Sequence, residues 1–140
     1  MANYAVRKYQ ETDMQAVLAF MSKVTDISGV NLDIVKNASI VLEDERVAGM
    51  VSYENIAGIG VIRYFIYNHY SLPDLLVNMF FGLYSEAKKA GVNRLVAMVA
   101  NPHAYQLFEL LGFSEVAYSE ELHVSHLMEA ENSAVMSINL

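Results

Sequence analysis

The chain contains no cysteine and only two prolines among its 140 residues. Without cysteine it forms no disulfide and offers no thiolate for catalysis or metal binding. Two prolines and seven glycines are too few for a collagen-like or low-complexity chain. Hydrophobic residues make up 54% of the sequence and charged residues 18%, which is the reverse of a disordered composition. These values indicate one compact domain over residues 1–140.

Long apolar runs and targeting signals are also missing. Uncharged stretches such as residues 95–108 are shorter than a membrane span, and this one is interrupted by Asn101, Pro102 and His103. The first residues, Met1–Tyr4, show no basic region followed by an apolar run, so no signal peptide is expected. We therefore expect a cytoplasmic protein that makes no membrane contact.

Positive charge is scarce and unevenly placed. The net charge is −2 over residues 1–70, +1 over residues 71–94 and −6 over residues 95–140, where no Lys or Arg occurs. Nucleic-acid binding needs clustered basic side chains to neutralise phosphates, and this chain has no such cluster. The acidic final third suits a cationic ligand such as an amine, or is simply a solvated face.

The first half of the chain predicts strands around two helices. Residues 4–9 alternate as a strand, and Thr12 to Gln15 has the form of a capping box that begins a helix reaching about Lys23. Asn31 is positioned to cap a short second helix through Val35. Three strand-like runs follow, at 39–42, 47–53 and 58–67, and the first two are joined by the polar residues 43–46.

The second half predicts a helix, a strand, a helix and two strands. Ser71, Pro73 and Asp74 are typical of a helix start, and Lys88 to Gly91 of a helix end. A buried strand at 94–99 precedes a helix that begins at Asn101 or Pro102 and ends at Gly112, with strands at 115–124 and 134–140.

The predicted order is therefore strand, two helices, three strands, helix, strand, helix and two strands. The strand–helix–strand step predicts a parallel pair, and the hairpins predict antiparallel pairs. We expect an α/β (α+β) fold with one mixed, twisted sheet of about seven strands and helices on both faces.

This order, together with the segment from Asn101 to Phe113, resembles the GCN5-related N-acetyltransferase (GNAT) superfamily. Members commonly carry Asn, two residues, Ala, three residues, Tyr, three residues and Gly-Phe, and Asn101, Ala104, Gly112 and Phe113 match this spacing. The similarity in element order covers nearly the whole chain, and the local similarity is concentrated in residues 58–113.

The resemblance implies an N-acetyltransferase that moves an acyl group from acetyl-CoA, or another acyl-CoA, to a small-molecule or peptide amine. It implies that two strands, at 61–67 and 94–99, splay apart around the pantetheine arm of the cofactor. The backbone of Phe65, Ile66 and Tyr67 would face that arm, and Asn101 would lie near it.

Two departures from the family pattern concern the cofactor phosphates and the catalytic acid. The family usually has a Gly-rich loop with Arg or Gln before its long helix, whereas residues 70–76 contain no glycine and no basic residue. By the resemblance, Leu75 and Leu76 at the end of this stretch would also contact the cofactor. Phe108 stands where active members usually carry the tyrosine that protonates the leaving thiolate. Tyr105, three residues earlier, can substitute or can be a packing aromatic.

Other candidate groups have weaker support. Glu54 follows a predicted strand, where a family base can lie. His123 and His126, with Glu129 and Glu131, could suggest a metal site, and the two histidines have a spacing that would suit one helical face. Nothing predicts a helix there, so we expect no metal site. His69 is next to the predicted cofactor entrance, where a lone histidine is more often structural.

Two functions remain open from the sequence. The first is an acyl-CoA-dependent N-acyltransferase. The second is a GNAT-fold protein without catalysis that binds a ligand, regulates or assembles. Six aromatic residues would crowd the cofactor region and could fill the cleft or form a dimer surface: Tyr64, Phe65, Tyr67, Tyr70, Phe80 and Phe81. A homodimer is compatible with both, because an edge strand needs protection.

Overall fold

The computed structural model describes residues 3–68, 73–116 and 134–140. The strands are β1 (Tyr4–Lys8), β2 (Ser39–Glu43), β3 (Arg46–Ile56), β4 (Ile59–Tyr67), β5 (Arg94–Val99), β6 (Ser114–Glu115) and β7 (Ala134–Asn139). The helices are α1 (Met14–Met21), α2 (Leu32–Val35), α3 (Pro73–Lys89) and α4 (Pro102–Leu110), with 3₁₀ turns η1 (Glu11–Asp13) and η2 (Ile27–Gly29).

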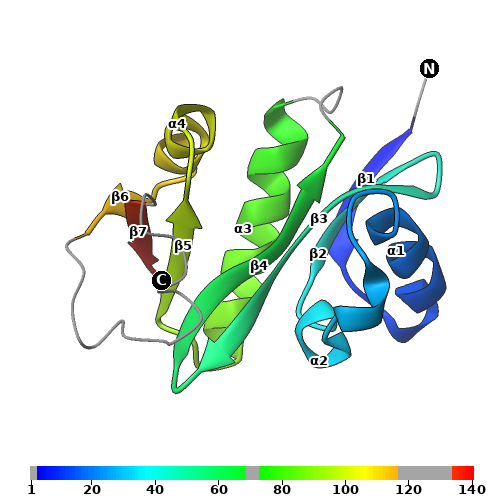
Figure 1. Ribbon diagram of the computed structural model, residues 1–140, viewed down its shortest axis with the longest axis horizontal. Helices are drawn as coiled ribbons and strands as arrows, with labels where there is room; N and C mark the ends of the chain where they lie inside the picture. The colour runs from blue at the N-terminus through cyan, green and yellow to red at the C-terminus, as the bar shows by residue number, and fades with distance from the viewer. Residues whose placement is uncertain (1–2, 69–72, 117–133) are drawn as a thin grey trace.

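The seven strands form one mixed, twisted sheet in the order β1-β2-β3-β4-β5-β7-β6 (Figure 1). Helix α3 connects β4 to β5, and these two strands are the parallel pair that the sequence predicts. The other neighbouring strands pair antiparallel. The predicted fold class and order of elements are confirmed. Most of the predicted strand at 115–124 lies outside the described residues.

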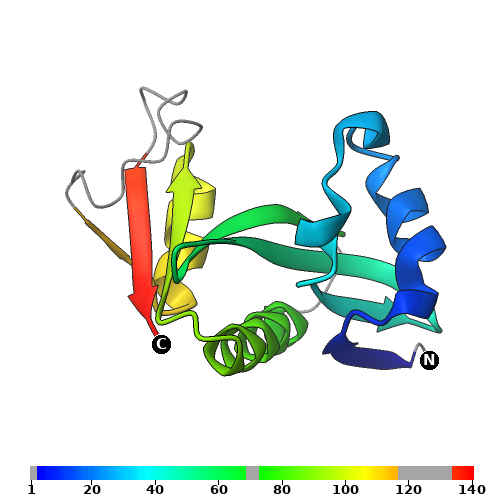
Figure 2. The same ribbon diagram turned by 90° about the horizontal axis from the view of Figure 1, so that it is seen from below.

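Helices cover both faces of the sheet, as predicted. Helices α1 and α2 lie on one face, and α3 and α4 lie on the other (Figures 1 and 2). The larger core lies under α3 and α4 and contains the fully buried Met79, Phe80, Leu83 and Leu95. The smaller core lies under α1 and α2 around Met21, Val35, Ile40 and Met50.

Two tight hairpins join β2 to β3 and β3 to β4. The first turns at Asp44 and Glu45, with φ of 49° and 69°, and the second at Ala57 and Gly58, with φ of 53° and 88°. Positive φ at both turn residues is the type I′ pattern that matches the twist of hairpin strands. The polar segment 43–46 is the predicted connection, although only its two central residues form the turn.

The start of the first helix differs from the predicted capping box. Thr12 lies inside η1, and the reciprocal cap joins Gln10 to Asp13. The Asp13 carboxylate accepts from the backbone N–H of Gln10 at 2.7 Å and from both terminal nitrogens of Arg7, at 2.7 and 2.8 Å. The Asp13 carboxylate accepts charge-assisted hydrogen bonds from Arg7 as well as the cap bond from Gln10. Asp13 is therefore a stronger capping residue here than Thr12. The Asn31 cap is confirmed, with its side chain accepting from the N–H of Asp33.

Candidate functional site

Strands β4 and β5 pair only at one end. Their register joins Ile59 to Arg94, Gly60 to Leu95 and Val61 to Val96, and no pair follows. Beyond Val61 the two strands diverge (Figure 1). We call the region where residues 62–67 of β4 and residues 97–99 of β5 diverge the wedge. Among the described residues, backbone groups along that edge of β4 have no strand partner, so they are available to a ligand.

Gly60 sets the closed end of the wedge. A Cβ built on Gly60 would lie 2.5 Å from Cδ2 of Leu95 and 3.2 Å from Cδ2 of Tyr53. A side chain at this position would therefore push β4 away from β5. Glycine at position 60 permits β4 and β5 to pair closely at the closed end of the wedge, and the two strands diverge beyond it.

A bulge in β4 adds a residue inside the wedge. Met50 pairs with Ile66 and Ser52 with Arg63, so Tyr64 and Phe65 together oppose Val51. Tyr64 has φ of 54°, a left-handed conformation that costs a non-glycine residue on the order of 1–3 kcal/mol.

Contacts around Tyr64 hold this conformation in place. Its hydroxyl accepts from the backbone N–H of Asn31 at 3.0 Å, and the Arg63 guanidinium lies 5.3 Å from its ring centroid. Without the bulge, Ile62, Tyr64 and Ile66 would share a face. With it, Phe65 joins Ile62 in the α3-side core, whereas Tyr64 and Ile66 pack on the α1 side. Sequence reasoning missed this bulge, because no glycine or proline marks it.

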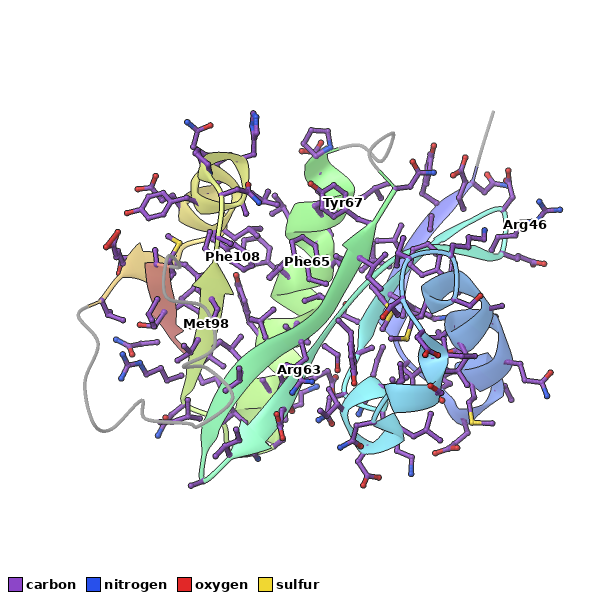
Figure 3. All side chains as sticks on the ribbon, in the orientation of Figure 1. Arg46, Arg63, Phe65, Tyr67, Met98 and Phe108 are labelled. Carbon is purple, nitrogen blue, oxygen red and sulfur yellow. The ribbon has the colours of Figure 1, made fainter. Side chains whose placement is uncertain are left out.

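Aromatic rings line the wedge on its α3 side. Phe108 from α4 and Phe65 from β4 point toward each other between the two strands (Figure 3), with ring centroids 5.8 Å apart. Phe80 contacts both rings edge-on at 5.0 and 5.7 Å. Tyr67, 41% exposed, stacks on Phe65 at 5.1 Å nearer the open end. The predicted crowding is therefore real for Phe65, Phe80 and Tyr67, whereas Phe81 is exposed and Tyr64 packs elsewhere.

A pocket follows the same segment of β4 on the other face of the sheet. It has a volume of about 540 Å³ and is lined by Val24, Thr25 and residues 64–67. The wedge and this pocket therefore meet at the same four residues of β4. The sequence did not indicate Val24 or Thr25, which lie in an irregular segment after α1.

Asn101 and Tyr105 lie on the α4 side of β5. The Asn101 carbonyl oxygen Oδ1 accepts from the N–H of Ala104 at 2.8 Å and so caps α4. Tyr105 lines a pocket of about 520 Å³ with Asn101, Gln106 and Glu109. Its hydroxyl hydrogen bonds to Glu115 of β6, and this bond raises the pKa of Tyr105 above its ordinary value, with smaller contributions from burial and from the Glu109 charge.

Tyr105 and Phe108 thus occupy different environments on one helix. Phe108 is 5% exposed and its ring faces the wedge, whereas the Tyr105 hydroxyl is held by the edge strand β6. Helix α4 is itself fixed to α3, because the hydroxyl of Tyr84 donates to the carbonyl of Leu111 at 2.8 Å. The structure brings the rings of Phe65, Tyr67 and Phe108 together, whereas the Ile66 side chain packs on the other face of the sheet and the Tyr105 hydroxyl lies apart from them.

The first turn of α3 is the predicted phosphate end of the site. Pro73 begins the helix and lacks a backbone N–H, and Asp74 places a carboxylate in the first turn. The side chain of Leu76 is 7% exposed and packs in the core, whereas Leu75 lines a different pocket beside β1. The β4 edge fits the amides of a pantetheine arm, but this helix end does not fit a pyrophosphate. Residues 69–72, with His69, lie outside the described part.

Glu54 is held in an ion pair. Its carboxylate accepts from Arg63 at 2.8 Å, between β3 and β4. Within residues 3–68, 73–116 and 134–140, no group of three or more His, Asp or Glu side chains is arranged to hold a metal ion. The residues considered for a metal, His123, His126, Glu129 and Glu131, lie outside these ranges. None of the described helices is long and apolar enough to cross a membrane.

Known acetyltransferases share this architecture. The N-acetylglutamate synthase of Neisseria gonorrhoeae, solved with coenzyme A and N-acetylglutamate, has a TM-score of 0.73 and 16% identity over 100% of this chain. A GNAT-family acetyltransferase of Streptococcus pneumoniae has a TM-score of 0.72 and 18% identity, covering 99% of both chains. The PaiA N-acetyltransferase of Thermoplasma acidophilum, solved with coenzyme A, has a TM-score of 0.68 and 11% identity, also covering 99% of both.

These similarities establish the fold. The chain has the GNAT fold, and it spans 36% of the length of the Neisseria synthase but 99% of the two smaller enzymes. No protein-family model matches the sequence, and a search of curated proteins finds no match. Since all three identities are below 20%, activity and substrate are argued from the site itself.

Proposed function

We propose that this protein is an N-acyltransferase that uses acetyl-CoA or another acyl-CoA as its acyl donor. One observation carries the proposal: β4 leaves β5 after Val61 and presents an unpaired backbone edge through Tyr67. Two enzymes of the same fold were solved with coenzyme A, which supports an acyl-CoA co-substrate.

The backbone of Phe65, Ile66 and Tyr67 would bind the pantetheine arm as a further strand binds a sheet edge. The aromatic side of the wedge, formed by Phe65 and Phe108, would keep water from the thioester. The co-substrate supplies a thioester, whose acyl carbon forms a bond to the amine nitrogen as the carbon–sulfur bond breaks. The released thiolate then takes a proton from a general acid.

Tyr105 is our candidate for that acid. A tyrosine hydroxyl is protonated at neutral pH, which an acid requires, and the pKa of Tyr105 lies above its ordinary value. In the present arrangement that proton is shared with Glu115, so the role requires the hydroxyl to leave this partner. Asn101 supports the site indirectly, because its cap fixes the first turn of the helix that carries Tyr105 and Phe108.

The acceptor in this proposal is a small-molecule or peptide amine. The pocket lined by Val24, Thr25 and residues 64–67 opens onto the opposite face of the same β4 segment, which gives an amine an approach separate from the wedge.

We further propose a metal-free, cytoplasmic homodimer. Strand β1 supports the dimer, since it pairs only with β2 among the described residues and leaves one edge for a partner.

A second function, binding without catalysis, has its own support. Phe108 has no proton to donate, and Pro73 and Asp74 weaken the phosphate end of the site. A protein of this kind would bind a ligand at the wedge or assemble through it and would release no thiol.

Thiol release distinguishes these two functions. The purified protein is incubated with acetyl-CoA and a panel of polyamines, amino acids and short peptides, and free coenzyme A is measured with a thiol reagent. Because the chain contains no cysteine, the protein contributes no background signal. Amine-dependent release above a heat-denatured control supports the transferase. Binding of acetyl-CoA without release for any amine supports the non-catalytic function.

A further inference from the structure

A third pocket lies between the edge strand β1 and helix α3, which are neighbours in space (Figure 2). Its volume is about 480 Å³, within the range of small-molecule sites. Polar side chains line much of it: Lys8, Asn37, Ser39, Asn78, Ser85 and Glu86. The wedge uses none of these residues.

A buried hydroxyl without a partner lies in the wall of this pocket. Ser39 is 3% exposed, and its Oγ has no hydrogen-bond partner among the described residues. A buried hydroxyl left unpaired is unfavourable by about 1–3 kcal/mol. A ligand that forms a hydrogen bond with this hydroxyl would remove that cost.

A glycine on α3 keeps space beside this hydroxyl. Gly82 lies in the middle of the helix, where glycine is less stable than alanine by about 1 kcal/mol. A Cβ at Gly82 would lie 3.1 Å from Oγ of Ser39. The helix therefore carries an unfavourable residue at the position where a side chain would cover Ser39.

The ion pairs at the pocket leave Lys8 able to bind an anion. Glu86 has two cationic partners, Lys8 at 3.2 Å and Lys89 at 3.6 Å, and these partners lower the pKa of its carboxyl. Lys8 can therefore turn to a bound carboxylate while Glu86 keeps Lys89. A bound cation would instead compete with both lysines for Glu86. Arg7, which also lines the pocket, is already paired with Asp13.

Strand register fixes the spacing of the two binding groups. Lys8 and Ser39 are directly opposite each other on β1 and β2, so their side chains start about 5 Å apart on one face. We propose that this pocket is a second ligand site, which binds a small carboxylic acid through Lys8 and a hydroxyl or carbonyl group on the same molecule through Ser39.

The test is a titration of the full-length ¹⁵N-labelled protein followed by NMR. Lactate and pyruvate are the probes. Propionate lacks the second group, and lactamide lacks the carboxylate. Lactate or pyruvate should shift the amides of Lys8, Ser39 and Gly82 in a saturable way. Propionate and lactamide should each bind at least about fivefold more weakly, as expected for the loss of one hydrogen bond or ion pair.

Two variants and a control locate the site. Ser39→Ala should remove the preference for lactate over propionate, and Lys8→Gln should remove the preference for lactate over lactamide. Lys23→Gln changes an exposed lysine just after α1 that does not line this pocket, and it should change neither preference. The absence of saturable shifts, or a lactate preference that survives in a folded Ser39→Ala protein, would overturn the proposal. Neither result depends on acyl-CoA binding.

Discussion

Asp13 shows how much one side chain contributes to the N-terminal part of the fold. Its carboxylate accepts from Arg7 and from the N–H of Gln10, and the Arg7 bonds, above all, hold its pKa below the ordinary value. Asp13→Asn keeps the shape but removes the charge. We expect a loss of about 1–3 kcal/mol in the free energy of unfolding at pH 7, measured by urea denaturation.

The stability difference between wild type and Asp13→Asn should depend on pH, and the direction of the pKa shift fixes the direction of that dependence. A carboxyl whose pKa is lower in the folded state stabilises the fold above its unfolded pKa of about 4, and that stabilisation is lost as the pH falls through the folded value. The difference between wild type and Asp13→Asn should therefore shrink below about pH 4. An equal difference at pH 7 and pH 3 would contradict the assignment.

Tyr105 supplies the residue-scale test of catalysis. If it is the acid, Tyr105→Phe should lower kcat by about a hundredfold or more and leave the Kd for acetyl-CoA unchanged. Because a general acid must be protonated, the wild-type rate should hold through neutral pH and fall only at alkaline pH, where the tyrosine hydroxyl ionises. A rate within twofold of wild type would mean that the thiolate leaves without Tyr105. Tyr84→Phe, which loses a hydroxyl bonded to the Leu111 carbonyl, is the matched control.

At the scale of elements, the wedge depends on how closely β4 approaches β5 at its base. Gly60→Ala introduces a Cβ that would overlap the Leu95 side chain, so we expect a loss of about 1–3 kcal/mol in the free energy of unfolding. Gly29→Ala is the control, because nothing lies within 4 Å of a Cβ there. Chemical denaturation compares the two. Equal stability of both variants would show that β4 does not need glycine at this position.

The first turn of α3 should determine how tightly the cofactor phosphates bind. The double change Pro73→Gly with Asp74→Gly restores a backbone donor and removes a repelling charge. We expect the Kd for acetyl-CoA to fall about tenfold or more, since each effect is worth on the order of 1 kcal/mol. Binding of pantetheine, which lacks the phosphates, should not change. Asp74→Asn alone should give part of the gain. No gain for acetyl-CoA would place the phosphates elsewhere.

Elements with strong local signals were predictable from the sequence. Asn101 caps α4 and Asn31 caps α2 as expected, since an Asn side chain directly before an apolar helical segment can accept a hydrogen bond from an N–H of the first turn. The start of α1 was not predictable in the same way. The reciprocal cap joins Gln10 to Asp13 at the start of η1, which precedes α1, and Asp13 is fixed by Arg7 on the preceding strand, which is a tertiary contact.

The candidate site was predictable in position but not in detail. The resemblance placed the wedge at β4 and β5, and the register confirms the splay. The bulge at Tyr64 depends on a left-handed tyrosine held by Asn31, and no local rule anticipates it. The environment of Tyr105 depends on Glu115, which the sequence shows only as a residue ten positions away.

For the whole molecule, the fold and the chemistry of the site give different indications. The GNAT fold and the open β4 edge favour an acyl-CoA, whereas Phe108, Pro73 and Asp74 weaken the acid and the phosphate contacts. These two indications agree if the protein binds the co-substrate mainly through its pantetheine arm. Affinity should then depend little on salt, because few phosphate contacts contribute to it.

Calorimetric titration of acetyl-CoA into the purified protein is the most direct test of this account. We predict saturable binding with one site per chain and a Kd in the micromolar range, and weaker binding when Phe65→Arg places a charged side chain in the wedge. Absence of binding at millimolar acetyl-CoA would contradict the account. The chain would then be a GNAT fold whose wedge does not receive an acyl-CoA.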